Sequence, residues 1–211
     1  MFFRKKVVRA ERFELVDRAG KTRAVLGVTT GDAPRLSFFD KDGEARAELS
    51  MDETGSTTIR FADKEKRLRV VLGVAGDGSP VMGLSDEADL PRAMLTVDEA
   101  GSSRLSFADE EGQTRVTISV AAEGASYLSF HDGDGQTRAE LVLETAGSPG
   151  LIFVDKERNT RAAFSILPDG SPRLRLFDQN GKLRARMLLG DNGVANLSFF
   201  NEFERRVWTS P

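Results

Sequence analysis

The sequence of 211 residues contains no cysteine and a single histidine, His131. Without cysteine the chain has no disulfide bond, no zinc–thiolate site, no iron–sulfur cluster and no cysteine nucleophile. One histidine excludes a metal site built from several histidines, and any serine–histidine catalytic pair would depend on that one residue. These absences remove most common catalytic and metal chemistries, and we predict neither a cofactor nor a metal ion.

Long apolar runs are also missing. No segment approaches the roughly 18 consecutive apolar residues that a membrane-spanning helix needs. Phe2 and Phe3 do not form the apolar region of a secretory signal. We therefore expect a cytoplasmic protein, and peripheral attachment to the cytoplasmic side of a membrane is left open.

The charges show no excess of either sign, since 30 Lys and Arg face 33 Asp and Glu, for a net charge of -3. A domain that binds nucleic acid usually carries a clear basic excess, so we predict no nucleic-acid partner. Residues 1–12 hold five basic residues and one acidic residue, a net +4, which leaves -7 on the rest of the chain. The sequence thus predicts a basic N-terminal arm, residues 1–11.

What the sequence does contain is a repeat of 23 residues. Counted from Arg12, eight complete repeats follow one another over residues 12–195 without insertion or deletion, and an incomplete ninth covers residues 196–211. Positions 2, 4, 13, 15 and 17 are apolar in every complete repeat. Apolar residues at alternate positions predict two β-strands in each repeat.

Glycine separates these strands. Position 9 is Gly in five of the eight complete repeats and position 21 is Gly in seven, often after Asp or Asn. Such steps between alternating runs are typical of β-hairpins. A two-residue turn at Asp42–Gly43 would place the apolar side chains of its hairpin on one face. The predicted pairs are Lys41 with Glu44, Phe38 with Ala47, and Leu36 with Leu49.

We predict an all-β repeat protein of nine β-hairpin units, arranged as an antiparallel meander. In the alternative, a two-sided β-solenoid, the Asp at position 6 and the Arg at position 12 would stack directly on their own copies. Like charges facing each other destabilise a sheet, which favours the meander. A sheet with one bare apolar face should curl, or pack on a partner or a second copy. The ninth repeat, with Trp208 at an Ala position, is predicted to be a cap.

The pattern LSFFDKDGEARAEL at Leu36–Leu49, with DGSP at Asp77–Pro80, resembles repeat arrays of uncharacterised bacterial proteins. It is more distantly similar to the tyrosine–aspartate repeats of rearrangement-hotspot shells, which have aromatic-x-Asp-x-x-Gly spacing. The resemblance covers residues 12–200, with Tyr replaced by Phe or Leu. It implies a β-hairpin fold and no particular activity.

No residue is predicted to be catalytic or to bind a cofactor. His131 occupies position 5, which varies among the repeats, so we interpret it as an ordinary surface histidine. Asp40 and Asp132 begin segments that resemble the start of a calcium loop. The twelfth residues of those segments, Met51 and Leu143, are apolar where such a loop needs Glu. We therefore predict no metal site.

Arginine occupies position 12 in all eight complete repeats. A column of guanidinium groups would suit phosphate or carboxylate ligands. Asp is as regular at position 6, so pairing between the two columns is the preferred interpretation. A binding module that uses the Arg-bearing face for an anionic ligand or lipid headgroups is the alternative function.

Two further groups of residues are predicted to contact partners. One lies on the face opposite the apolar positions, where extra apolar side chains suggest a protein contact. The other lies in the N-terminal arm, where an aromatic pair and three basic residues suit an anionic membrane or an acidic partner. The first group is Phe39, Ile152, Val154, Phe177, Leu188 and Phe200, and the second is Phe2, Phe3, Arg4, Lys5 and Lys6.

The regular array leaves no insertion of the kind that usually carries catalytic groups. We therefore expect a non-enzymatic structural or interaction protein, a scaffold or peripheral subunit of a larger assembly, with a protein partner or self-association. An extracellular fibre or stalk is a weaker alternative, because the first residues provide no secretion route.

Overall fold

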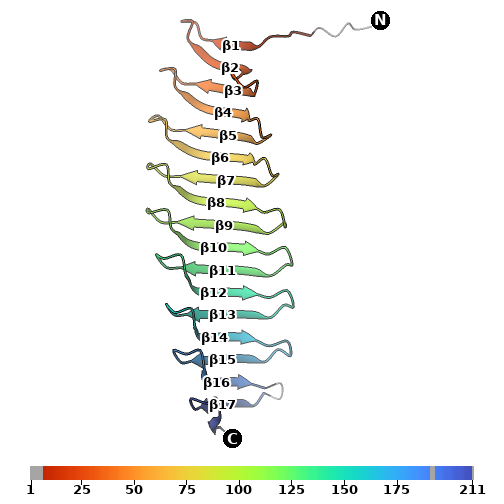
Figure 1. Cartoon of the computed structure of the whole chain (residues 1–211), viewed down its shortest axis with the longest axis vertical. Coiled ribbons are helices and arrows are strands. Elements are labelled where there is room, and N and C mark those ends of the chain that lie inside the picture. The colour runs from red at the N-terminus through yellow and green to blue at the C-terminus, as the bar shows by residue number, and fades with distance from the viewer. Residues whose placement is uncertain (1–6, 191–192, 211) are drawn as a thin grey trace, which may run out of the picture. The chain divides into compact units, whose positions relative to one another are not determined.

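The computed structural model describes residues 7–190 and 193–210, which form β-strands and no helix. These residues accordingly include no helix long and apolar enough to cross a membrane. The chain divides into two compact units, Met1–Glu99 with β1–β8 and Ala100–Pro211 with β9–β18. Figure 1 labels the strands from β1 to β17. The strands are β1 (Arg12–Val16), β2 (Thr22–Val28), β3 (Pro34–Phe39), β4 (Ala45–Met51), β5 (Thr57–Ala62), β6 (Leu68–Val74), β7 (Pro80–Ser85), β8 (Pro91–Val97), β9 (Ser103–Ala108), β10 (Thr114–Val120), β11 (Ser126–His131), β12 (Thr137–Leu143), β13 (Pro149–Val154), β14 (Thr160–Ile166), β15 (Pro172–Phe177), β16 (Leu183–Leu189), β17 (Ala195–Phe200) and β18 (Arg206–Thr209).

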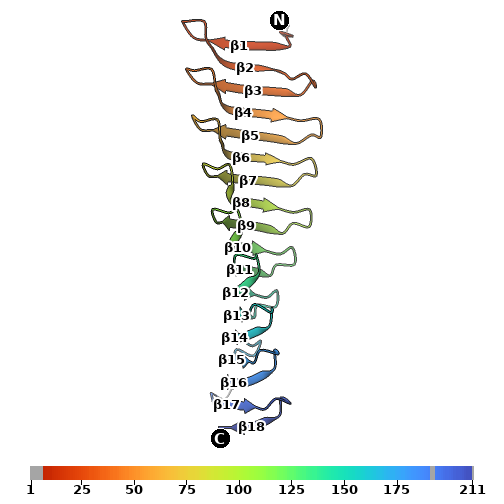
Figure 2. The same ribbon diagram turned by 60° about the vertical axis from the view of Figure 1, so that its left-hand side comes forward.

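Within each unit the strands form an antiparallel meander, in which each strand pairs with its neighbours along the chain. Figure 2 shows the same order of strands from a second direction. The all-β hairpin meander is therefore confirmed, and the two-sided solenoid is wrong because its coils would pair in parallel. Each sheet is open: among the described residues no pairing joins β1 to β8 or β9 to β18.

The register of β3 and β4 agrees with the prediction. Phe38 pairs with Ala47 and Leu36 pairs with Leu49. All four side chains therefore lie on one face of the sheet, with the large Phe38 opposite the small Ala47. The same pairing of positions 4 and 13 recurs along both units.

The turn between β3 and β4 differs from the prediction. The N–H of Asp40 donates to the carbonyl of Glu44 at 3.0 Å, and the N–H of Gly43 donates to the carbonyl of Asp40 at 3.2 Å. The loop thus has three residues, and the predicted pairing of Lys41 with Glu44 is wrong. A bulge after Phe38 takes up the extra residue, which is why the strand register is unaffected.

The same loop recurs at both ends of the hairpins in both units. Its third residue lies in the left-handed region, with φ between 57° and 97°. Glycine reaches this region without a steric cost, which explains its periodic recurrence in the sequence. Among the described residues, five loops keep the same conformation with another residue: Asp32, Lys66, Asp89, Arg158 and Glu204.

One face of each sheet consists of repeat positions 2, 4, 13, 15 and 17, and we name it the apolar face. None of these positions carries a charged residue in any repeat. Strands contact only their neighbours within the single layer, so no described strand of the same unit covers this face. Phe38, for example, keeps 48% of its surface exposed. Other large exposed side chains include Phe13, Leu26, Leu49, Phe61, Leu72, Met82 and Leu95 in the first unit and Phe107, Ile118, Phe130, Leu141, Phe153, Phe164, Leu176, Met187 and Phe199 in the second.

The opposite face, which we name the polar face, is the better covered one. Ser37, Ser129 and Ser198 are buried there, and Ser198 is completely inaccessible to solvent. Longer neighbours lie over these small side chains, as when the hydroxyl of Ser129 donates to the carboxylate of Glu140 at 2.9 Å. The apolar stems of long polar side chains thus shield the backbone on this face.

Arg158 should be replaceable by glycine with a gain in stability. It holds a φ of 69° in the loop after β13. A side chain in this region costs about 1 kcal/mol relative to glycine. Arg158→Gly should therefore raise the free energy of unfolding by about 1 kcal/mol, as measured by chemical denaturation followed by circular dichroism.

Gly135 provides the reverse control, since it occupies the same loop position one repeat earlier with a φ of 74°. No heavy atom would lie within 4 Å of a new Cβ there, so any effect comes from the backbone. Gly135→Ala should lower the free energy of unfolding by about 1 kcal/mol. A parent and two variants of equal stability would contradict the strain argument.

Candidate functional site

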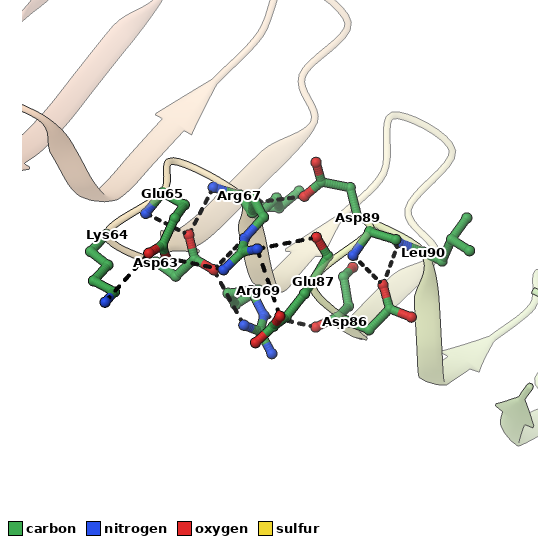
Figure 3. A network of polar contacts seen from close by, with 12 residues as sticks. Asp63, Lys64, Glu65, Arg67, Arg69, Asp86, Glu87, Asp89 and Leu90 are labelled. Atoms are coloured by element: carbon green, nitrogen blue, oxygen red, sulfur yellow. Dashed lines mark hydrogen bonds and ion pairs between the residues drawn. The ribbon is translucent and has the colours of Figure 1, made fainter. Parts of the chain in front are cut away.

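Asp63 shows how the end of each hairpin is fixed (Figure 3). Its Oδ1 accepts hydrogen bonds from the backbone N–H groups of Glu65 and Arg67, both at 3.0 Å. Its Oδ2 accepts from Nε of Arg67 at 2.8 Å and from Nη1 of Arg69 at 3.3 Å. One carboxylate therefore closes the loop and holds the arginine at position 12.

This pairing of position 6 with position 12, which we name the clamp, occurs in every complete repeat. The Arg column is therefore neutralised by the Asp column, and pairing, the interpretation preferred from the sequence, is confirmed. The clamps are Asp17–Arg23, Asp40–Arg46, Asp63–Arg69, Asp86–Arg92, Asp109–Arg115, Asp132–Arg138, Asp155–Arg161 and Asp178–Arg184.

The clamp arginines also connect successive hairpins. Nε of Arg69 donates to the carbonyl of Ser85 at 3.0 Å, and Nε of Arg161 donates to the carbonyl of Phe177 at 3.2 Å. Each acceptor lies at the end of the first strand of the next repeat. Arg69 and Arg161 are thus held by their own hairpin and by the following one.

Seven of the clamps favour the ionised form of their aspartate. At Asp63, burial opposes ionisation, but hydrogen bonds from Arg67 and Arg69 outweigh it and lower the pKa to about 2. At Asp178 the backbone N–H of Lys182 is the largest cause of a lowered pKa, and the side chain of Arg184 adds to it. The pKa is also lowered, by the same kinds of hydrogen bond, at Asp17, Asp40, Asp86, Asp132 and Asp155.

The segments that resemble calcium loops are therefore engaged in clamps. Oδ1 of Asp132 accepts from the N–H groups of Asp134 and Gln136, while its Oδ2 binds Arg138. The part of the chain that the structure describes contains no group of acidic or histidine side chains that could hold a metal ion.

His131 lies on the polar face between two threonines. Its Nε2 is 2.5 Å from the hydroxyl of Thr117, and its Nδ1 is 3.4 Å from the hydroxyl of Thr137. Among the described residues, both ring nitrogens thus have threonine hydroxyls as neighbours. That His131 is an ordinary surface histidine stays a prediction.

The first group of predicted contact residues, from Phe39 to Phe200, lies half-buried on the polar face. The guanidinium carbon of Arg175 lies over the ring of Phe177, 5.5 Å from the ring centroid. The guanidinium carbon of Arg186 lies over the ring of Phe200 in the same way, at 5.8 Å. Phe39 lines a shallow groove of about 460 Å³ in the first unit. The predicted contact residues of the N-terminal arm, Phe2 to Lys6, lie outside the described residues.

A bare apolar face was predicted for the sheet, and the apolar positions do form the more exposed face in both units. The sequence did not lead us to expect Arg175 and Arg186 as neighbours, although they pair directly across β15 and β16. The register alone would have revealed this pair, because repeat positions 3 and 14 face each other in every hairpin.

No protein-family model and no curated protein matches the chain. Among solved structures the chain is similar to the TCP domain of SAS-4 (dCPAP) of Drosophila melanogaster in complex with a proline-rich motif of Ana2 (dSTIL). The identity is 13% and the TM-score 0.47, over 77% of this chain and 88% of that one. It is also similar to a part of TcdB2–TccC3, with 11% identity and a TM-score of 0.20, over 93% of this chain and 16% of that one. Similarities with TM-scores this low give no information about function.

The clamps should make the protein sensitive to acid. A carboxyl whose pKa is lowered by folding stabilises the folded state fully when the pH is above its ordinary pKa, near 3.8. This stabilisation is lost as the pH falls through the pKa of the folded state, which is about 2 for Asp63. The melting temperature should therefore decline as the pH is lowered from about 4 to about 2. Thermal unfolding across this pH range, followed by circular dichroism, measures the effect.

Asp63→Asn isolates the contribution of one clamp. The variant should melt at a lower temperature than the parent at pH 7, and the difference should shrink at acidic pH. Asp42→Asn is the matched control, because that carboxylate lies in a loop where its ion pair is with Lys41 at 3.5 Å. A loss of stability in the control as large as that in Asp63→Asn would argue against the clamp.

Proposed function

We propose that this protein is a non-catalytic structural scaffold that assembles through its apolar face. The observation that carries the proposal is the continuous exposure of large apolar side chains, without any charge, along one face of both units. Water-exposed apolar patches of this extent are typical of protein contact sites. The clamps stabilise the hairpins without using this face, so it is available for assembly.

The partner that fits this face best is a second copy of the chain. A face without charge meets no like-charge repulsion when it packs on itself. Its large residues at position 4, such as Phe130 and Phe153, alternate with small ones at position 13, such as Ala139 and Ala162. An identical copy has the same spacing, so large side chains of one copy can lie over small side chains of the other.

The exposed area is sufficient for a stable dimer. Thirteen large apolar side chains of the first unit and fifteen of the second are exposed on this face. At roughly 80 Å² each, about half of what an aromatic side chain buries in a core, they give on the order of 1,000 Å² in each unit. A standard interface buries about 800 Å² on each partner. Either unit alone would thus supply an interface of ordinary size.

In this proposal the dimer is a building block of a larger assembly. We further propose that the N-terminal arm attaches the assembly to a membrane or an acidic partner and that the protein is cytoplasmic. Both parts of the proposal are predictions from the sequence. The groups on the polar face that are available for catalysis are few, since His131 and the clamp aspartates are held by their neighbours.

Phe38 and Phe39 offer a matched test, because they are adjacent in β3 and lie on opposite faces. The full-length parent should sediment as a dimer. Phe38→Glu should weaken the dimer at least tenfold, because a charge would be buried in an apolar interface. Phe39→Glu should leave the dimerisation constant unchanged. Sedimentation velocity across a concentration series measures the constant, and circular dichroism verifies folding.

Two results would contradict the proposal. A parent that stays monomeric at the highest soluble concentration would rule out packing of two copies. Loss of the dimer in Phe39→Glu but not in Phe38→Glu would place the contact on the polar face, among the apolar residues that the sequence predicted for partner binding.

A further inference from the structure

Three arginines lie together on the polar face of the second unit. Arg175 in β15 and Arg186 in β16 face each other directly across the two strands. Arg173 lies two residues before Arg175 on the same face of β15. Directly opposed residues have Cβ atoms about 5 Å apart, and residues two apart on a strand are separated by about 7 Å. Three positive charges are therefore concentrated in a small area.

Other arginines of the polar face form ion pairs with carboxylates. Arg173, Arg175 and Arg186 form none with any residue that the structure describes. In the first unit Arg12 pairs with Glu14 at 2.6 Å, and Arg35 pairs with Glu48 at 3.4 Å. No corresponding ion pair with a described residue exists for the three arginines of the second unit. Among the described residues, the one hydrogen bond of their side chains is to the hydroxyl of Ser165, 3.4 Å from Nη2 of Arg173.

Their inner nitrogens are also unsatisfied. The Nε atoms of Arg173, Arg175 and Arg186 are buried and have no hydrogen-bond partner among the described residues. A buried donor without an acceptor costs stability, and like charges facing each other cost more. The burial of Arg175 and the charge of Arg173 accordingly lower the pKa of Arg175.

The repeat does not require arginine at these places. The same opposed pair of positions is Ser37 with Glu48 in the second repeat and Ser129 with Glu140 in the sixth. A hydrogen bond joins serine to glutamate there instead of two repelling charges. A feature that the fold does not need, and that costs stability, points to a ligand.

The surroundings are those of a binding site. Arg173 and Arg175 line a hollow of about 200 Å³ together with Gly150, the buried Ala163 and the acidic Glu144. Phe177 supports the guanidinium group of Arg175 by a cation–π contact. Such support fixes the direction of a guanidinium group and lowers the entropy that it loses when a ligand binds.

We propose that Arg173, Arg175 and Arg186 form a binding site for a phosphate group. Guanidinium groups bind phosphate oxygens in a bidentate manner, and several of them suit a ligand with two negative charges. A single carboxylate would neutralise only one of the three. The phosphate can belong to a soluble phosphate compound or to a lipid headgroup, since the recognised chemistry is the same.

The test measures binding of two probes by the full-length protein. Isothermal titration calorimetry with pyrophosphate at constant ionic strength detects a soluble ligand. Co-sedimentation with phosphatidylcholine vesicles, with and without phosphatidic acid, detects a lipid headgroup. We expect saturable binding of at least one probe, and Arg175→Gln and Arg186→Gln should each weaken it at least tenfold.

Arg60→Gln is the matched control, because Arg60 occupies the same repeat position as Arg175 but faces Val71 and Glu48 across its strand. This variant should bind as the parent does. Thermal unfolding separates binding from folding: removing one charge from the Arg175–Arg186 pair should not lower the melting temperature, since it relieves a repulsion.

Binding of pyrophosphate assigns the site to soluble phosphates, and binding only to vesicles with phosphatidic acid assigns it to a headgroup. The proposal is overturned if neither probe binds. It is also overturned if Arg175→Gln and Arg186→Gln retain the parent affinity, or if Arg60→Gln loses affinity to the same extent. None of these results depends on whether the protein dimerises, because the apolar face is not involved.

Discussion

The carboxylate at the end of each hairpin is the constraint on which the rest of this structure depends. Asp63 closes its loop through Oδ1 and holds Arg69 through Oδ2, and Arg69 in turn reaches the backbone of Ser85 in the next hairpin. A single-layer sheet has no core between two layers to hold its strands together. Here a chain of charge-assisted hydrogen bonds, repeated every 23 residues, supplies part of that cohesion at the edge of the layer.

The two faces of the sheet consequently differ in role. The polar face contributes to the stability of the single chain, with buried serines such as Ser198 beneath long side chains. The apolar face contributes little to it, since Phe38 and its equivalents remain about half exposed. This separation explains how a surface so rich in large apolar residues can be free for assembly while the hairpins hold their shape.

Much of the fold could be predicted from the sequence, because an unbroken period fixes the register once one hairpin is aligned. The pairs Phe38–Ala47 and Leu36–Leu49 are correct for this reason. The predicted loop of two residues is one residue shorter than the observed loop of three. Glycine indicates where a left-handed φ is needed, but it does not indicate how many loop residues precede it. The bare apolar face follows from the same periodicity, but what covers it could not be predicted, because an alternating apolar pattern looks the same whether a partner covers it or not. The contact of Arg175 with Phe177 depends on side-chain directions that the spacing alone does not give.

The local character of the pairing also bears on how the protein reaches this structure. Most all-β proteins fold slowly, because their strands pair with partners far away in the sequence and the entropy of closing long loops is lost before contacts form. Within each unit of this chain, every strand pairs with the next across a three-residue loop. Its contact order is therefore closer to that of a helical bundle than to that of a β-sandwich. Hairpins can form independently and extend one after another, so folding should be fast for a sheet of this size.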